Sequence, residues 1–564
     1  MEQRFGQADN VTRLSWVVII LVFLYRLFLC ATIATAESPD EWWQSTEVAY
    51  HMVFGKGHLP WEWHYGLRSV LFPGIIAFPF FLLKLVGLDT AWTVWFSSRL
   101  LQACVITAID LCIFKLGDSM DAALEDAETE KLNSSSSSVV IFSVKGLRRR
   151  RNASIARTAL LLSLTNWYMT FVGVRIYSNV IEALFVLLAL QERSYVRFLL
   201  LSGVATAIRV TSGAVLFPLL FLHVYWQVRE WGTFKGLARI VLWGAVMVAA
   251  VLGSVTLLDS FFYKRWIVTS LAFFRFNVLQ NASRFFGEHA WYFYFFPSLP
   301  CLVGPHFLFT LSTPLVLWYD KESRAAARQL CGIIGLTLWT LGCYSLIDHK
   351  ENRFIVTVLP FCFIVTAFVL SQLYHKSHAV RRLHRAFILL NIIVALLAGY
   401  VYRRGPLDVM AEVRSGPELE RLDIIATCYT TPGFSYMHTK VKHLGLIDCS
   451  MHLDENTGLP ALTEDIMFRR YSKDYVLWKY DGVHTFNKSD QKESSKAAEL
   501  ERTVEPKSAP LPEVMVMFHT FAKKMRGPFL HKHGYQLYRS FLHAPLAMAP
   551  YEDIYMDMWV RKVV

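Results

Sequence analysis

The sequence predicts an α-helical polytopic membrane protein with a small α/β domain at its C-terminal end. Hydrophobic residues make up 54% of its 564 residues and charged residues only 18%, whereas soluble proteins contain about a quarter charged residues. The mean hydropathy is +0.34, and apolar runs of spanning length recur along the chain. This composition excludes a disordered chain, a coiled coil and a disulfide-stapled secreted domain.

Spanning helices need roughly 17 to 25 mostly apolar residues. The run 198–226 is too long for one span and is interrupted from Arg209 to Gly213, so we expect a tight pair of helices there. The run 70–88 is ambiguous because Pro73 and Pro79 interrupt the helical hydrogen bonds. The runs that qualify directly are 14–33, 95–116, 155–172, 176–191, 238–258, 301–319, 329–347, 353–375 and 385–402.

Basic clusters orient the chain, because Lys and Arg accumulate on cytosolic loops. This also accounts for the net charge of +12, so no nucleic-acid partner is expected. All clusters share the cytosolic side only if 198–226 crosses twice and 70–88 is a re-entrant or interfacial segment, which gives about eleven crossings. The clusters are Arg148–Arg151, 193–197, 228–239 and 375–385; residues 1–13 are then cytosolic, and 34–94, 259–300, 348–352 and 403–564 are luminal.

Two segments differ in composition from the spanning helices: the loop 117–154, inside the transmembrane domain 14–402, and the tail that follows this domain. The cytosolic loop 117–154 is acidic, then Ser-rich, then basic, which predicts a flexible solvated linker. The tail 403–564 alternates short Val, Ile, Tyr and Phe runs with Pro and Gly, which predicts a small α/β domain with a polar insert at 481–510. Cys428 and Cys449 are the only cysteines of the tail. In an oxidising lumen they form either one disulfide or two free thiols.

The first luminal loop begins with the acids Asp40 and Glu41, directly after the first span. A carboxylate at the membrane surface suits the task of a general base. The alternative is that Asp40, following Pro39, caps the next helix. Both roles are compatible if Glu41 is left for another task.

A second cluster, Asp348-His-Lys-Glu-Asn-Arg-Phe354, lies between two late spans. Ionisable groups at a membrane edge are costly and usually functional. His349, Lys350 and Arg353 are able to converge on an anion, with Arg supplying a planar fork. The alternative is that these cations reach towards lipid headgroups, but Glu351 is not needed for that role.

The long loop 259–300 contains His289 and the aromatic run Trp291–Tyr294. Such residues form either the interfacial aromatic belt or stacking platforms for sugars. The chain has no Walker motif, no dinucleotide-binding glycine motif, no zinc-ligand spacing and no Asp-x-Asp pair. We therefore expect neither a metal nor a cofactor, because protein cations are able to hold a lipid monophosphate as it leaves.

These motifs resemble a known family. Pro39-Asp40-Glu41 after the first span and His349-Lys-Glu-x-Arg353-Phe late in the chain are similar to the motifs of the GT-C glycosyltransferases, and of glycosyltransferase family 22 in particular. The likeness is strongest to the branch that builds the glycosylphosphatidylinositol (GPI) anchor. It extends over Gln44-Ser-x-Glu47, Trp61-Glu-Trp63 with Leu67-Arg-Ser69, Arg404–Met410, Cys428–Pro432, His438 and Asp448-Cys449.

The resemblance implies a GT-C fold in the endoplasmic reticulum membrane and an inverting transfer of the third, α-1,2-linked mannose from dolichyl-phosphate mannose to the GPI precursor. Asp40, helped by Glu41, would be the base. His349, Lys350, Arg353 and Arg68 would bind the donor phosphate, with Glu351 orienting the cations. Gln44, Trp61, Glu62 and Trp63 would line the acceptor side. On this topology Asn281 and Asn487 are luminal glycosylation candidates.

Two other functions compete with this interpretation. Another member of the family would act on a dolichol-linked oligosaccharide or add a fourth GPI mannose. A lipid scramblase or transporter would instead show internal repeats and charges deep in the spans, whereas the charges gather at one face of the membrane.

Overall fold

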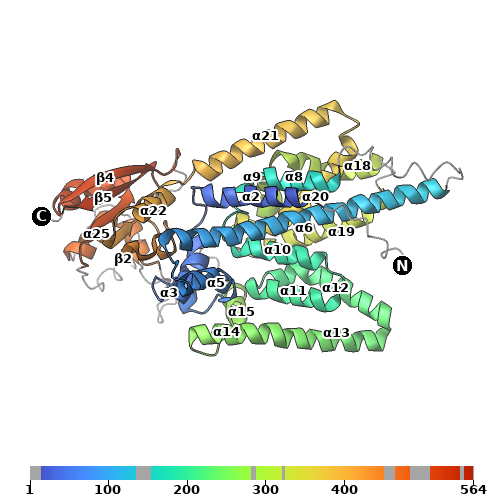
Figure 1. Ribbon diagram of the computed structural model, residues 1–564, viewed down its shortest axis with the longest axis horizontal. Helices are drawn as coiled ribbons and strands as arrows, with labels where there is room; N and C mark the ends of the chain where they lie inside the picture. Colours follow the sequence, from blue (N-terminus) through green and yellow to red (C-terminus); the bar gives the residue numbers. More distant parts are fainter. Residues whose placement is uncertain are drawn as a thin grey trace. The chain divides into compact units, whose positions relative to one another are not determined.

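The computed structural model describes residues 14–134, 154–280, 287–319, 324–449, 464–482, 509–546 and 552–562. The chain forms two compact units, each assembled from separate stretches of sequence (Figure 1). Unit 1 consists of Met1–Thr32, Gly66–Phe72 and Arg99–Leu396. Unit 2 consists of Ile33–Tyr65, Pro73–Ser98 and Leu397–Val564.

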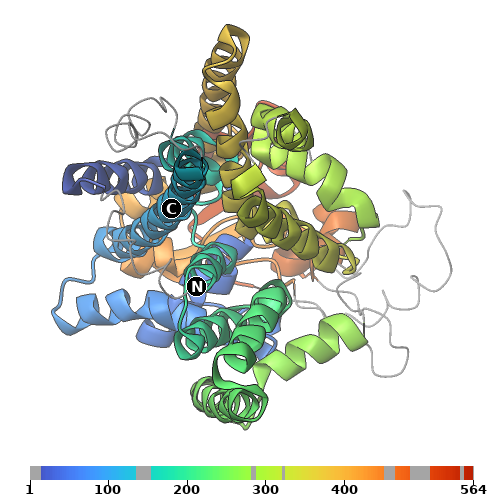
Figure 2. The ribbon, with the colours of Figure 1, turned by 90° about the vertical axis from the view of Figure 1, so that its right-hand side faces the viewer.

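Unit 1 is helical, and Figure 2 shows many of its helices end-on. Its main helices are α2 (Trp16–Thr32), α6 (Ala91–Ser134, from Arg99 onward), α8 (Ile155–Thr165), α9 (Trp167–Phe171), α10 (Ser178–Leu190), α11 (Tyr195–Ile208), α12 (Ser212–Trp231), α13 (Thr233–Met247), α14 (Gly253–Tyr263), α15 (Thr269–Phe274), η7 (Tyr294–Ser298), α16 (Leu299–Val303), α17 (Phe307–Leu311), α18 (Thr313–Tyr319), α19 (Arg324–Ser345), η9 (Asn352–Val358), α20 (Leu359–Leu373) and α21 (His378–Tyr400).

Within the described residues, five helical stretches are long and apolar enough to cross a membrane: Ala91–Glu125, Thr233–Tyr263, Trp291–Trp318, Asn352–Leu373 and His378–Tyr400. Shorter apolar helices include α2, α8, α10 and α11, and also α5 (Leu71–Leu85), which contains Pro79. The fold class is thus a helical membrane protein.

Polar residues divide the longer apolar runs into separate helices. Arg209 leaves the helical conformation, with φ −143° and ψ 118°, so the run 198–226 forms the two helices α11 and α12. Asn166 divides the run 155–172 and caps α9, because its Oδ1 accepts hydrogen bonds from the backbone N–H of Tyr168 (3.1 Å) and Met169 (2.9 Å).

The flexible linker predicted for 117–154 is wrong over its first part. Helix α6 continues as far as Ser134. The stretch after 117 contains several Ala, Leu and Glu residues, which favour helices, and extending an existing helix avoids the cost of nucleation. Residues 135–153 lie outside the described part of the chain.

A buried ion pair joins three helices of unit 1. Arg26 and Asp110 are both 0% exposed, and the guanidinium donates two hydrogen bonds of 2.7 and 2.9 Å to the carboxylate. Ser163 Oγ donates a third hydrogen bond, of 2.7 Å, to Asp110. The charge that interrupts the first apolar run is therefore neutralised within the protein.

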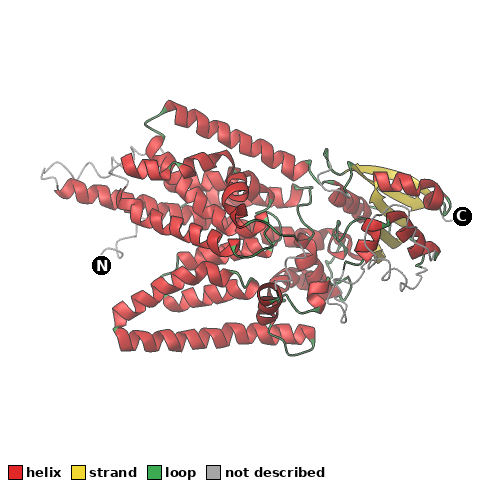
Figure 3. Ribbon diagram, turned by 180° about the vertical axis from the view of Figure 1, so that it is seen from behind, coloured by secondary structure: helices red, strands yellow, loops and turns green. Residues whose placement is uncertain are grey.

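Unit 2 contains a five-stranded sheet, to which the strands in Figure 3 are confined. The order is β2-β1-β3-β5-β4; β1 is parallel to β2 and β3, and β5 is antiparallel to β3 and β4. The small α/β domain expected from the tail is therefore present. The strands are β1 (Leu419–Ile425), β2 (Val441–Gly445), β3 (Val514–Phe518), β4 (Tyr535–Leu542) and β5 (Tyr555–Arg561).

Helices cover both faces of this sheet. Because side chains alternate along a strand, Leu422 and Ile424 of β1 face α22 (Gly405–Ser415), together with Trp42 and Trp43 of the first loop. The opposite face packs on α24 (Glu464–Arg470), α25 (Ser472–Asp481) and α27 (His519–Met525). The first loop therefore shares a core with the tail, and this unit does not begin at the boundary of 403 drawn from the sequence.

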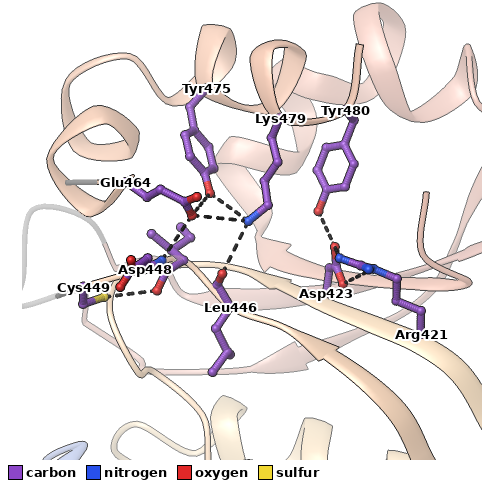
Figure 4. Close-up of polar contacts among 10 residues, drawn as sticks. Arg421, Asp423, Leu446, Asp448, Cys449, Glu464, Tyr475, Lys479 and Tyr480 are labelled. Carbon is purple, nitrogen blue, oxygen red and sulfur yellow. Dashed lines mark hydrogen bonds and ion pairs between the residues drawn. The ribbon is translucent and has the colours of Figure 1, made fainter. Parts of the chain in front are cut away.

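Buried polar contacts attach α25 to the sheet (Figure 4). Tyr480 donates a 2.5 Å hydrogen bond to Asp423, which also pairs with Arg421 at 2.9 Å. Lys479 Nζ lies 2.9 Å from the hydroxyl of Tyr475 and 3.5 Å from Glu464. Each buried charge in this network therefore has an opposite charge beside it.

A disulfide joins the segments that follow the first two strands. Cys428, after β1, is bonded to Cys449, after β2, with their Cα atoms 5.8 Å apart. Of the two alternatives left open by the sequence, the structure contains the bridge.

Candidate active site

The acids of the first loop lie at the start of a helix in unit 2. Asp40 is the first residue in helical conformation, and helix continues through η2 (Trp42–Thr46) and α3 (Glu47–Phe54). The Oγ of Ser38 lies 3.5 Å from the backbone N of Asp40, so Ser38 occupies the capping place. We call the segment Asp40–Phe54 the first-loop helix.

The two acids differ in burial. Asp40 is half-buried, whereas Glu41 is 0% exposed and its carbonyl accepts a hydrogen bond from Ser45 Oγ. The partly accessible carboxylate of Asp40 is therefore the better placed of the two to meet a substrate hydroxyl.

Gln44 connects the first-loop helix to the short helix α4 (Trp61–His64). Its Nε2 lies 3.5 Å from Glu62 Oε1. The rings of Trp61 and Trp63 are buried, at 7% and 2% exposure, whereas Glu62 is half-buried. Glu62 is thus the most accessible of the three residues that the family resemblance assigns to the acceptor side on this helix.

The late basic motif lies in unit 1, where His349 and Arg353 converge on one carboxylate. His349 Nε2 is 3.0 Å from Glu351 Oε1, and Arg353 Nη2 is 2.6 Å from Glu351 Oε2. Arg353 is 4% exposed, and its guanidinium lies 5.0 Å from the centre of the Tyr177 ring. The motif therefore holds two cations side by side on an internal acid.

The third cation of the motif points elsewhere. Lys350 Nζ donates hydrogen bonds to the carbonyls of His289 (2.9 Å) and Ile347 (2.5 Å), and the residue is 2% exposed. The backbone N–H of His289 in turn donates to the carbonyl of Asp348. Lys350 thus attaches the loop containing His289 to the motif and does not join His349 and Arg353 at Glu351.

The pKa shifts in the motif follow from these contacts. Burial acts to raise the pKa of Glu351, but the charge of Arg353 and the hydrogen bond from His349 lower it to about 2. The same hydrogen bond raises the pKa of His349 above its ordinary value. Desolvation lowers the pKa of Lys350. The Glu351 carboxylate is therefore charged at neutral pH, and its contact with His349 stabilises the protonated imidazole relative to the neutral one.

A cavity in unit 1 contains two arginines. It is lined by Leu67–Ser69, Ala207–Thr211, Thr269, Ser270 and Phe273, and so contains both Arg68 and Arg209. Arg209 forms an ion pair with Glu182 at 2.9 Å. Its guanidinium also lies 5.3 Å from the centre of the ring of Phe354, the residue that follows Arg353 in the sequence. We call this hollow the arginine cavity.

Asp259 is not one of the lining residues of the arginine cavity, but it is hydrogen-bonded to two of the segments that line it. Asp259 accepts hydrogen bonds from Ser69 Oγ (3.0 Å), from the backbone N–H of Val70 (2.9 Å) and from Thr269 Oγ1 (2.6 Å). These bonds fix the turn that bears Arg68 to the segment that bears Thr269. The lining segments that contain Arg68 and Thr269 belong to the loops 34–94 and 259–300, which the charge pattern assigns to the same side of the membrane.

Sequence reasoning did not single out three residues that matter here. Arg209 served only to mark a helix break, although an arginine inside an apolar run is itself a sign of function. Glu182 carries the same sign, since it is an acid within a predicted span. Glu47 entered only as one letter of a family motif, and nothing in its spacing predicts the contacts described below.

Among the described residues, Cys428, Cys449 and Asp465 are close enough together to suggest a metal site. Their two sulfurs are joined in the disulfide, so they do not provide thiolate ligands. The glycosylation candidates Asn281 and Asn487 lie outside the described residues.

Comparisons with known proteins agree with the fold and motifs. The structure resembles the crystal structure of ArnT from Cupriavidus metallidurans bound to undecaprenyl phosphate, with a TM-score of 0.50, 14% identity and coverage of 96% of this chain and 97% of the other. This likeness concerns the fold alone. The shared fold is that of a helical membrane protein.

Residues 16–438 match the profile of the Alg9-like mannosyltransferase family, and the chain belongs to that family. It is 60% identical to GPI mannosyltransferase 3 of Trypanosoma brucei brucei, over 97% of this chain and 100% of the relative. It is 30% identical to GPI alpha-1,2-mannosyltransferase 3 of Danio rerio, over 77% and 74% of the two chains. The resemblance seen in the motifs is therefore confirmed, and the chain is a mannosyltransferase.

Proposed function

We propose that this mannosyltransferase adds the third, α-1,2-linked mannose to the GPI precursor, with dolichyl-phosphate mannose as the donor. The observation that carries the proposal is the 60% identity to GPI mannosyltransferase 3, which extends over nearly the whole chain, tail included. The vertebrate relatives carry the α-1,2 linkage in their names. We place the enzyme in the endoplasmic reticulum membrane, with its chemistry on the luminal side.

The proposed reaction is a single displacement. Asp40 accepts the proton of the acceptor's 2-hydroxyl as that oxygen attacks the anomeric carbon of the donor mannose. The bond from this carbon to the phosphate oxygen breaks on the opposite face, so a β-linked donor gives an α product. The electron pair leaves with dolichyl phosphate. Glu41, buried beside Asp40, supports the base.

On the donor side, His349 and Arg353 provide charge for the leaving phosphate. Glu351 holds both in one orientation and compensates their charge while no phosphate is bound. Arg68 and Arg209, both in the arginine cavity, add two further cations. Lys350 does not contact the phosphate and instead holds the motif through its hydrogen bonds to the carbonyls of His289 and Ile347. These residues stabilise the developing negative charge, which is the role a metal ion has in other transferases.

On the acceptor side, Gln44 and Glu62 supply hydrogen-bonding groups to the sugar. Trp61 and Trp63 are buried, so they act as the packed support of α4.

Complementation tests the assigned step. Cells that lack the third GPI mannose and express this chain should convert the two-mannose precursor to one with three mannoses, as measured by chromatography of labelled lipid extracts. Asp40→Asn is the matched negative control. Persistence of the two-mannose precursor, with the protein present in the membrane, contradicts the proposal. A change in dolichol-linked oligosaccharides would favour the other family function.

Orientation is tested separately by mapping glycans. The proposal expects N-glycans at Asn281 and Asn487 but not at Asn10, Asn133 or Asn152. Glycans on any of the last three would contradict the proposed orientation.

A further inference from the structure

The first-loop helix presents one row of side chains to the segment that follows β1. Trp43, Glu47 and Tyr50 are spaced three and four residues apart, so they lie on one helical face. Trp43 Nε1 donates a 3.0 Å hydrogen bond to the carbonyl of Thr431, and the hydroxyl of Tyr50 lies 3.0 Å from His438 Nδ1. All of these residues belong to unit 2.

Glu47 is the middle residue of this row and is 0% exposed. Its Oε1 accepts hydrogen bonds from the backbone N–H of Gly433 (2.9 Å) and of Ser435 (3.1 Å) and from Ser435 Oγ. The Ser435 hydroxyl also lies 3.1 Å from Thr46 Oγ1. One carboxylate oxygen thus gathers three donors from the tail.

The Glu47 carboxylate lies against the connection that leaves the carboxyl end of β1. In open sheets, ligands bind beyond the carboxyl ends of the strands, where successive connections leave to opposite faces. Here the connection after β1 packs with α22 through Tyr436 and Met437, whereas the connection after β3 packs on the other face through Ala522 and Met525. Glu47 contacts the first of these connections, through Gly433 and Ser435.

The fit at this place is close. A Cβ atom at Gly433 would lie 2.8 Å from Glu47 Oε2, nearer than such atoms approach one another, so an alanine there would push the carboxylate away from its present position. The donors named above are all neutral, and burial of an acid among neutral groups is costly. Packing alone would be served as well by an apolar residue, which suggests that the hydrogen bonds themselves are required.

We propose that Glu47 is a positioning residue for mannosyl transfer. Its hydrogen bonds to Gly433 and Ser435, which we call the clasp, attach the first-loop helix to the tail domain. The tail domain thereby sets the position of Asp40. The clasp lies two helical turns after Asp40 in one continuous helix, so a tilt of this helix displaces the base. A displacement of about 1 Å is able to cost about 10²-fold in rate. The inference rests on the proposed role of Asp40 and gives the tail domain a part in catalysis.

The test compares variants on both sides of the clasp in purified, monodisperse protein. Glu47→Ala should lower kcat about 10- to 100-fold and leave the apparent KM for the donor unchanged. Glu47→Gln should restore most of the activity, because an amide oxygen accepts the same hydrogen bonds. Gly433→Ala should lower kcat like Glu47→Ala. Gly527→Ala is the matched control, because a Cβ there meets nothing within 4 Å.

A double variant distinguishes positioning from loss of fold. If Gly433→Ala acts by displacing the carboxylate, adding it to Glu47→Ala should cause no further loss of kcat. Full kcat in Glu47→Ala overturns the proposal, and so do independent, multiplying losses in the double variant. Full activity in Asp40→Asn would instead remove Asp40 as the base, the role on which this inference rests, and would leave the assigned mannose step standing. If Asp40→Asn is inactive and both clasp variants are fully active, only the clasp proposal fails.

Discussion

Two glutamates, Glu47 in the first-loop helix and Glu351 in the late basic motif, are held in opposite ways. Glu47 receives its hydrogen bonds from Gly433 and Ser435, and burial raises its pKa to about 7 although these bonds act to lower it. Glu351 lies against Arg353 and His349. There the charge of Arg353 and the His349 hydrogen bond outweigh burial and lower the pKa of Glu351 to about 2.

The difference shows what a buried carboxylate needs to keep its charge. At Glu47 the neutral donors do not offset the effect of burial on the pKa, whereas at Glu351 the adjacent cations do. Glu351 is therefore a fixed anion that orients two cations. Glu47, which accepts hydrogen bonds from Gly433 and Ser435, changes its protonation state near neutral pH.

The largest effect is expected from the base at the start of the first-loop helix. Asp40→Asn keeps the shape of the side chain but removes its proton acceptor, so kcat should fall about 10²- to 10⁴-fold. The measurement is transfer of labelled mannose to acceptor glycolipid in detergent. Glu420→Gln, at a carboxylate 54% exposed and paired with Lys442, is the control. Wild-type turnover by Asp40→Asn would assign the base elsewhere.

The next effect concerns stability and separates the two glutamates directly. Because the pKa of Glu47 is raised from 4.5 to about 7, the folded state binds its proton more tightly. This stabilisation is complete below about pH 4.5 and is lost as pH rises through 7, at a cost of about 3 kcal/mol. Glu47→Gln should therefore gain stability over wild type between pH 5 and 8, as measured by thermal unfolding. If the melting temperatures of Glu47→Gln and wild type changed with pH in the same way, the raised pKa of Glu47 would be contradicted.

On the cationic side, Arg353→Ala should weaken use of the donor. Loss of a hydrogen bond to a charged group costs about 1.5–3 kcal/mol, so the apparent donor KM should rise about 10- to 100-fold while the acceptor KM stays unchanged. Arg353→Lys should restore only part of the donor affinity, because lysine lacks the planar guanidinium group. Arg539→Ala, at an arginine 60% exposed, serves as the control. An unchanged donor KM would remove Arg353 from the phosphate site.

The smallest effect is a pH dependence within the late motif. The raised pKa of His349 means that its ion pair with Glu351 stabilises the fold fully below about pH 6.5 and is lost as pH rises through the folded pKa. The melting-temperature difference between wild type and Glu351→Gln should therefore shrink from pH 6 to pH 8. The change corresponds to about 1 kcal/mol, since the pair is partly exposed. A constant difference would mean that Arg353 alone holds Glu351.

Much of the fold followed from local patterns. Apolar runs predicted most of the helices, Arg209 marked the division between α11 and α12, and short Val, Ile, Tyr and Phe runs between Pro and Gly residues in the tail predicted the α/β domain. The extension of α6 to Ser134 was missed because acidic composition resembles a linker, although the same residues favour helix when a helix already precedes them.

The candidate site was predicted less completely. The sequence placed Asp40 and Glu41 after the first span and grouped His349, Lys350 and Arg353. It did not show that Lys350 turns away to the carbonyls of His289 and Ile347, because the direction of a long side chain depends on acceptors far away in the chain.

By itself the amino-acid sequence determined the membrane character, the helical and strand segments and the family, since these depend on composition, periodicity and short motifs. Only the tertiary structure decided that the first loop packs on the tail domain, that Arg68 and Arg209 share a cavity and that Glu47 reaches Gly433. These contacts join residues tens to hundreds of positions apart. Their energies come from burial and hydrogen bonds that exist only once the chain has folded.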